Sequence, residues 1–210
     1  MDVKDFILGL FFLVLYAGCQ TPVEVDNFMD PQLVQALNED GTINAVIEIP
    51  AGTNLKIEYD YQRKGFFPDR RNGKDRVIEY LPYPGNYGFI PSTKADTASG
   101  GDGDALDILV ICSSLPTGTV IPVQPIAMLA LFDQGEKDDK IIAVPADSLR
   151  RTLQVSDYKT LTDRYPKALV SIQHWFESYN PMDSVTNIQW HSERIAEKEV
   201  RKWLIANDKQ

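Results

Sequence analysis

The stretch NAVIEIPAGTNLKIEY, residues 44–59, contains two strand-like arms on either side of a turn signal. The first arm runs from Asn44 to Pro50 and is almost entirely apolar. The second arm, Leu55 to Tyr59, alternates apolar and polar side chains with the period of two that is typical of a half-buried β-strand. Between them lies Ala51-Gly52-Thr53-Asn54, a run of turn-forming residues. The pattern predicts a β-hairpin.

Further short strand-like runs follow through the middle of the chain, separated by Gly, Pro and Asp. They are Arg76–Tyr80, Ile108–Cys112, Val120–Pro125, Ile126–Phe132 and Ile141–Val144. Short strands at this spacing predict a small barrel or sandwich. No stretch between residues 44 and 207 has the composition of a linker, and no internal repeat is visible.

The hydrophobic period changes in the last third of the chain. Apolar residues recur at helical spacing from Leu161 to Tyr179, and again from Ile195 to Leu204 after His191-Ser192-Glu193. These segments predict two C-terminal helices. A closed β-barrel flanked by such helices is an α+β fold.

Composition excludes several classes of protein. The 210 residues, 43% hydrophobic and 24% charged, have the averages of a globular protein of one domain with some extra segments. Their 21 Lys and Arg against 30 Asp and Glu give a net charge of −9. This charge repels phosphate backbones and disfavours a protein that binds nucleic acid on a broad basic face. Any phosphate ligand is therefore expected to be small and locally compensated.

Cysteine and histidine are too few for the common stabilising sites. Cys19 closes an apolar run and Cys112 lies in a strand-like stretch, so a disulfide framework is not expected. With two His and no CxxC pair, the usual structural zinc site cannot be assembled either. Any metal ion is expected to use oxygen ligands.

The N-terminus has the form of a secretion signal. Residues Phe6–Ala17 carry no charge and are too few to span a membrane, which is typical of the apolar part of a signal peptide. Small residues before Cys19 resemble a bacterial lipobox, whose cysteine would carry a lipid anchor and place the protein in the cell envelope, lipid-anchored or periplasmic. The alternative is an N-terminal helix of a cytoplasmic protein. We therefore divide the chain into a signal segment (1–19), a polar tether and lead-in (20–43) and one domain (44–210).

The densest chemical signal is Ser99-Gly-Gly-Asp102-Gly-Asp104-Ala-Leu-Asp107, three carboxylates in a Gly-rich turn. Carboxylates this close repel one another unless cations lie between them, which points to a divalent metal site. The EF-hand pattern is absent, because the fifth and twelfth positions from Asp102 are Leu106 and Ser113. A solvated turn is the alternative interpretation of this motif taken alone.

Two further groups of charged residues accompany this turn. Asp133, Glu136, Asp138 and Asp139 precede Lys140 and an apolar strand, which alone is typical of a charged hairpin loop. Lys56 and Glu58 are two residues apart in a predicted strand and so share one face. Each group alone is more typical of a protein surface than of a site.

Taken in order, these elements resemble the family I soluble inorganic pyrophosphatases. The resemblance rests on Val46–Pro50, Lys56-Ile-Glu58, Asp75-Arg76, Tyr83-Pro-Gly-Asn-Tyr-Gly88, the D-G-D-x-x-D element at 102–107, and 133–140, and it runs from about Asn44 to Tyr179. It implies a five-stranded, OB-like closed barrel and Mg²⁺-dependent hydrolysis of pyrophosphate, with several metal ions in each active site and Mn²⁺ or Co²⁺ able to substitute. It also implies a homo-oligomer, commonly a hexamer in bacterial relatives.

The resemblance also implies roles for individual residues. Asp104 matches the general base for a water that bridges two metal ions. The acidic positions that serve the metals match Asp102, Asp107, Asp133, Asp138, Glu48 and Glu58. The phosphate-holding set and the tyrosine beside it match Lys56, Arg76, Tyr83, Tyr87, Lys140 and Tyr179.

Two features depart from the family pattern. Arg76 precedes Tyr83 by one residue fewer than in bacterial members, and the nearby Arg70 and Arg71 compete for its role. Asn180 stands where the family often has Lys, which weakens one expected phosphate contact.

Two other functions remain open from the residues alone. An OB-like module that binds single-stranded nucleic acid or sugar would need a basic groove with exposed aromatic residues, whereas this chain is acidic. A family relative that senses phosphate without hydrolysis is disfavoured by the presence of Asp104. Phosphate release with and without Mg²⁺ separates all three.

Overall fold

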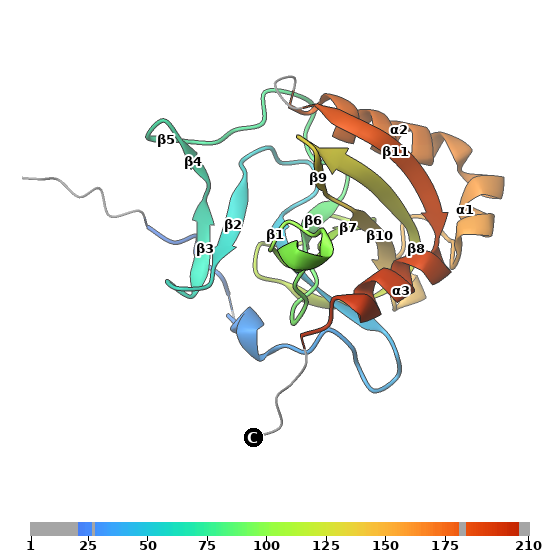
Figure 1. Ribbon diagram of the computed structural model, residues 1–210. Helices are drawn as coiled ribbons and strands as arrows, with labels where there is room; N and C mark the ends of the chain where they lie inside the picture. The colour runs from blue at the N-terminus through green and yellow to red at the C-terminus, as the bar shows by residue number, and fades with distance from the viewer. Residues whose placement is uncertain (1–20, 27, 181–183, 206–210) are drawn as a thin grey trace, which may run out of the picture.

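The computed structural model describes residues 21–26, 28–180 and 184–205 (Figure 1). Its strands are β1 (Ile43–Ile49), β2 (Ile57–Asp60), β3 (Gly65–Pro68), β4 (Arg70–Arg71), β5 (Lys74–Asp75), β6 (Asn86–Phe89), β7 (Asp107–Val110), β8 (Val120–Asp133), β9 (Glu136–Lys137), β10 (Lys140–Pro145) and β11 (Val185–Ser192). Its helices are α1 (Tyr158–Arg164), α2 (Pro166–Ser178) and α3 (Glu193–Lys202), with short 3₁₀ turns at Pro31–Leu33, Thr97–Ser99 and Ser148–Arg150. The predicted α+β class is confirmed, because the described residues form a mixed sheet accompanied by few helices.

Most of the described strands form one mixed sheet with the order β1-β6-β7-β10-β8-β11, and β9 pairs with β8. β1 also pairs antiparallel with β8, from Ile43 opposite Val123 to Val46 opposite Val120. β7 and β10 run parallel, which places Asp107 opposite Lys140. In Figure 1 the helices α1 and α2 lie on one side of this sheet, and β2 to β5 lie on the other.

The predicted hairpin between 44–50 and 55–59 is wrong. β1 pairs with β6 and β8, whereas β2 pairs with β3. β1 is buried along nearly its whole length and its backbone needs a partner on both edges. The two arms meet instead through a side chain, because the backbone N–H of Tyr59 donates to Glu48 Oε1 at 2.7 Å.

The prediction of a strand at 76–80 is also wrong, because these residues form no strand. Only Val77 makes a β-bridge there, to Leu55. A tight hairpin, β4–β5, precedes it and turns at Asn72 and Gly73, whose φ angles are 54° and 77°. Positive φ at both central residues is the mark of a type I′ turn, for which Asn-Gly is a preferred sequence.

The two strands predicted at 120–125 and 126–132 are one continuous strand, β8. Pro125 lacks the N–H that a sheet interior requires, and it lies opposite Ala143, where the register between β8 and β10 shifts. The local irregularity accommodates the proline without ending the strand. The strands predicted at 108–112 and 141–144 appear as β7 and β10, with bounds displaced by one or two residues.

The first predicted helix, 161–179, is divided into α1 and α2. Tyr165 lies between them with φ −134° and ψ 49°, outside the helical region, and Pro166 begins α2. Proline disfavours the helical conformation in the residue before it and suits the first position of a helix. The second predicted helix is α3. The strand β11, which covers one edge of β8, was not predicted.

Residues predicted as a tether and lead-in are packed against the domain where the structure describes them. The backbone N–H of Val23 donates to Phe66 O at 2.7 Å, and Val34 and Ala36 are buried. Residues 1–20, with the signal segment and Cys19, lie outside the described residues. Within the described ranges, no helix combines the length and apolar character needed to cross a membrane.

The core has two clusters on the two faces of the strands. Leu109 of β7 belongs to the cluster that includes Ile172 and Phe176 of α2. Its neighbours Ile108 and Val110 point the other way and belong to the cluster that includes Ala196 and Val200 of α3, as the period of two requires. Burial on both faces explains why β7 and β10 are apolar almost throughout and do not alternate.

Candidate active site

A cavity of about 510 Å³ opens beside the sheet, and its wall contains all thirteen predicted site residues that the structure describes. These residues are Glu48, Lys56, Glu58, Arg76, Tyr83, Tyr87, Asp102, Asp104, Asp107, Asp133, Asp138, Lys140 and Tyr179. They come from β1, β2, β6, β7, β8, β10, the connections between these strands and, for Tyr179, the C-terminal end of α2. Residues as far apart in sequence as Glu48 and Tyr179 thus converge on one wall. The fourteenth predicted site residue, Cys19, lies outside the described part of the chain.

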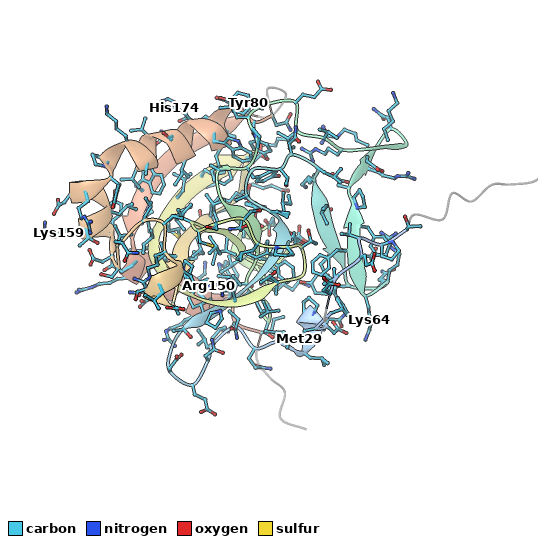
Figure 2. The ribbon with its side chains drawn as sticks, turned by 180° about the vertical axis from the view of Figure 1, so that it is seen from behind. Met29, Lys64, Tyr80, Arg150, Lys159 and His174 are labelled. Atoms are coloured by element: carbon cyan, nitrogen blue, oxygen red, sulfur yellow. The ribbon has the colours of Figure 1, made fainter. Side chains whose placement is uncertain are left out.

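Other residues of the wall had no predicted role at the site or only an open one. Trp175 and Phe176 have the helical spacing of core residues, and that pattern does not distinguish a core residue from one at a cavity wall. Arg71 lines the cavity together with Arg76, whereas Arg70 does not. Glu136 adds one more carboxylate to the cavity wall, and Gln134 adds a neutral amide. His174 lies on the outer surface of α2 with a side chain 68% exposed, away from the cavity (Figure 2).

Lys140 is the centre of the most buried charge cluster. Its ammonium group forms ion pairs with Asp107 and Asp138, and the Tyr87 hydroxyl donates to the same Asp107 oxygen. Burial opposes the charge on Lys140, yet Asp107 and Asp138 outweigh it and raise the lysine pKa. Burial raises the pKa of Asp138 to about 6 against the attraction of Lys140. The cluster therefore holds a permanent cation beside two carboxylates at the inner end of the cavity.

Glu48 faces the same space from β1. Burial raises the pKa of Glu48 to about 8, and the charges of Asp107 and Glu58 add to the effect. Its hydrogen bond from the Tyr59 backbone favours the ionised form but is outweighed. A buried carboxyl group among other carboxylates ionises fully only when positive charge is added close by.

The Gly-rich turn before β7 presents Asp102 and Asp104 to the cavity. The Asp104 backbone N–H donates to Asp102 Oδ1 at 2.9 Å, and Ala95 N donates to Asp104 O at 2.8 Å. Desolvation raises the pKa of the Asp104 carboxyl, and Asp102, Asp107 and Glu58 raise it further. A carboxylate of raised basicity on a backbone held by hydrogen bonds suits a proton acceptor.

A cluster of aromatic rings forms another part of the cavity wall. Tyr179 stacks on Trp175 with ring centroids 4.9 Å apart and an interplanar angle of 7°. Trp175 in turn packs against Tyr83 at 4.5 Å, and its indole N–H donates to Leu81 O at 2.9 Å. These contacts fix the ring of Tyr83 and orient the predicted phosphate-binding tyrosines.

The remaining predicted cations, Lys56 and Arg76, are partly buried in the cavity wall. Lys56 pairs with Glu58, as their shared face predicts, and lies 4.0 Å from Asp69 Oδ2. Arg76 Nη1 lies 3.3 Å from the same Asp69 oxygen. Asp69 thus places two cations side by side.

The donor set fits a hard divalent cation. Eight carboxylates face four Lys and Arg side chains on the cavity wall, and its residues include no His or Cys. Oxygen-only ligands are those that Mg²⁺ and similar ions prefer. Among the described residues, no three acidic, His or Cys groups already form a coordination shell. Repulsion between the carboxylates keeps them apart, and Lys140 lies between Asp107 and Asp138. Both effects explain why these groups do not form a coordination shell without added cations.

Comparisons with known proteins agree with this site. A family model described as inorganic pyrophosphatase matches residues 45–207. The inorganic pyrophosphatase of Synechocystis sp. is 39% identical over 163 residues, which are 76% of this chain and 88% of that protein. The crystal structure of the Thermus thermophilus inorganic pyrophosphatase has a TM-score of 0.67 and 30% identity, covering 87% of this chain and all of that one. The type I enzyme of P falciparum has a TM-score of 0.72 and 26% identity, covering 84% of this chain and 62% of that one.

The chain belongs to the inorganic pyrophosphatase family. It is an enzyme of that class, and the family predicted from the sequence is confirmed.

Proposed function

We propose that this chain hydrolyses inorganic pyrophosphate to two orthophosphates with the help of several divalent cations, Mg²⁺ above all and Mn²⁺ or Co²⁺ as substitutes. The observation that carries the proposal is the mixture of eight carboxylates with four cationic side chains on one cavity wall. The carboxylates alone would repel a small, highly charged anion. Oxygen ligands for metal ions and separate cations for phosphate oxygens resolve that conflict.

Asp102, Asp107, Asp133 and Asp138, with Glu48 and Glu58, would hold the metal ions. When bound, these ions neutralise the substrate and lower the pKa of the attacking water. Asp104 accepts a proton from that water as its oxygen attacks one phosphorus and the bond to the bridging oxygen breaks. Lys56, Arg76 and Lys140 bind phosphoryl oxygens, and the hydroxyl groups of Tyr83, Tyr87 and Tyr179 complete the phosphate contacts.

The strand pairings support a five-stranded, OB-like closed barrel as the scaffold. β1 pairs with β6, β6 with β7, β7 with β10, β10 with β8, and β8 with β1 again. A barrel interior filled by side chains leaves ligands to bind at the strand ends and loops, where this cavity lies. We also propose a homo-oligomer, a hexamer by analogy with bacterial relatives, to be checked by measuring the mass in solution.

Phosphate release from pyrophosphate, assayed with Mg²⁺ and with excess chelator, tests the function. We expect release with Mg²⁺ and only background release in chelator, because the carboxylates cannot approach the anion unaided. Full activity in chelator contradicts the proposal. Pyrophosphate binding without turnover in Mg²⁺ would indicate a sensor, and tighter binding to a single-stranded oligonucleotide would indicate a nucleic-acid module.

We propose further that the protein is exported to the cell envelope and anchored through a lipid on Cys19. The support is the uncharged run Phe6–Ala17 and the small residues before Cys19. Cys19→Ala is expected to move the native protein from the membrane fraction to the soluble fraction without changing kcat. Cys112→Ala is the matched control and leaves the distribution unchanged. A purified native protein whose first peptide still begins at Met1 contradicts this proposal.

A further inference from the structure

The strands β4 and β5 form a short β-hairpin beside the cavity. Asp69 and Arg76 flank its two strands, and the backbone N–H of Arg76 donates to Asp69 O at 2.7 Å. The type I′ turn at Asn72 and Gly73 closes the tip. Both ends of the hairpin are therefore fixed, and the residue before the turn, Arg71, has a defined position opposite Lys74.

The two arginines of β4 face different surroundings. Arg70 donates from Nε to Asp75 Oδ1 at 2.9 Å, in a pair whose side chains are both about half exposed. Adjacent residues of a strand point to opposite faces. Accordingly, Arg71 lines the cavity and Arg70 does not.

Arg71 differs from the other cations of the cavity wall in its pairing. Lys56, Arg76 and Lys140 each form an ion pair with at least one carboxylate. Within the part of the chain that the structure describes, Arg71 makes neither an ion pair nor a side-chain hydrogen bond, and it is exposed. Its five N–H donors and full charge are available to a ligand that enters from solvent.

We propose that Arg71 is a further substrate-binding residue, whose guanidinium group contacts the outer phosphoryl group of pyrophosphate at the cavity entrance. The inference rests on the proposed pyrophosphate hydrolysis and adds a contact beyond those of the ion-paired cations Lys56, Arg76 and Lys140. Arginine matches two phosphate oxygens in a bidentate arrangement. An exposed contact of this kind strengthens binding of substrate and transition state alike, so it acts on KM more than on kcat.

Arg71→Met tests the inference, with Lys74→Met as the matched control on the paired strand. We expect Arg71→Met to raise KM for pyrophosphate about 5- to 30-fold, the range for a charged hydrogen bond reduced by solvent screening, with kcat changed less than about twofold. The dissociation constant of imidodiphosphate, a non-hydrolysable analogue, measured by calorimetry in Mg²⁺, should rise by the same factor. Lys74→Met should leave both quantities near the parent values.

An unchanged KM and an unchanged imidodiphosphate affinity in Arg71→Met overturn the inference. An equal loss in Lys74→Met also overturns it, because the effect would then come from the general charge of the hairpin. If the parent protein fails to turn over pyrophosphate, the proposed function fails while the calorimetric comparison of Arg71→Met with Lys74→Met still decides whether Arg71 binds the anion. Equal melting temperatures of the three proteins verify that the fold is intact.

Discussion

Asp104→Asn is expected to lower kcat for pyrophosphate by about 10²–10⁴-fold, the usual contribution of a general acid or base. The amide keeps the shape of the carboxylate but accepts no proton. Asp104 is exposed at the cavity wall, and its backbone is held by hydrogen bonds with Ala95 and Asp102 that the substitution leaves in place. The fold and most of the metal binding should therefore survive, which unfolding curves and Mg²⁺ titration would verify.

Asp107→Asn is the informative comparison for Asp104→Asn. Asp107 accepts from Lys140 and Tyr87 at the inner end of the cavity, and we assign it to metal binding. Loss of its charge should chiefly raise the Mg²⁺ concentration needed for half-maximal rate. Rates of both variants measured over a wide range of Mg²⁺ decide between the roles. If excess Mg²⁺ restores Asp104→Asn but not Asp107→Asn, the two assignments are reversed.

Local sequence patterns located most of the elements but not their partners. The apolar runs of β7, β8 and β10 are visible because burial on both faces demands apolar residues. The choice of β6 and β8 as neighbours of β1 depends on contacts between distant residues, such as Ile43 with Val123, and periodicity carries no information about them. Proximity along the chain favoured the hairpin with 55–59, and tertiary pairing overrode it.

Two errors had signals that were present in the sequence. Tyr165-Pro166 marks a helix boundary, because proline removes a backbone donor and restricts the preceding residue. Asn72-Gly73 marks a type I′ turn and would have located the β4–β5 hairpin and, with it, Arg71. β11 lacked a comparable signal, since its apolar positions are only partly buried at the edge of the sheet.

The site was predictable from residue types and a family resemblance, not from local structure. Asp102, Asp104 and Asp107 form a cluster in sequence, but Glu48 and Tyr179 are separated by most of the chain. Only the fold shows that they share a cavity. Pairings such as that of Lys140 between Asp107 and Asp138 follow from the parallel register of β7 and β10, which no pattern within either strand reveals.

Gly88→Ala is expected to destabilise the protein more than a Gly→Ala substitution at any other glycine of the described sheets. Gly88 lies in β6 opposite Ile47 of β1, and a Cβ atom there would lie 1.9 Å from Val46 O and 2.9 Å from Val46 C. Backbone atoms of a strand paired on both edges cannot yield as a flexible side chain can. We expect a loss of at least about 3 kcal/mol in the free energy of unfolding, measured by denaturant titration.

Gly41→Ala separates this steric effect from the general cost of replacing glycine. Gly41 has φ +85° in an open turn, and an added Cβ would meet no atom within 4 Å. Its substitution should cost only the left-handed backbone strain, about 1–2 kcal/mol. A loss in Gly88→Ala no larger than that in Gly41→Ala would contradict the close approach of β1 and β6. Because Glu48 lies in β1 next to Ile47, the partner of Gly88, and Tyr87 precedes Gly88, any folded fraction of Gly88→Ala should also need more Mg²⁺ for activity.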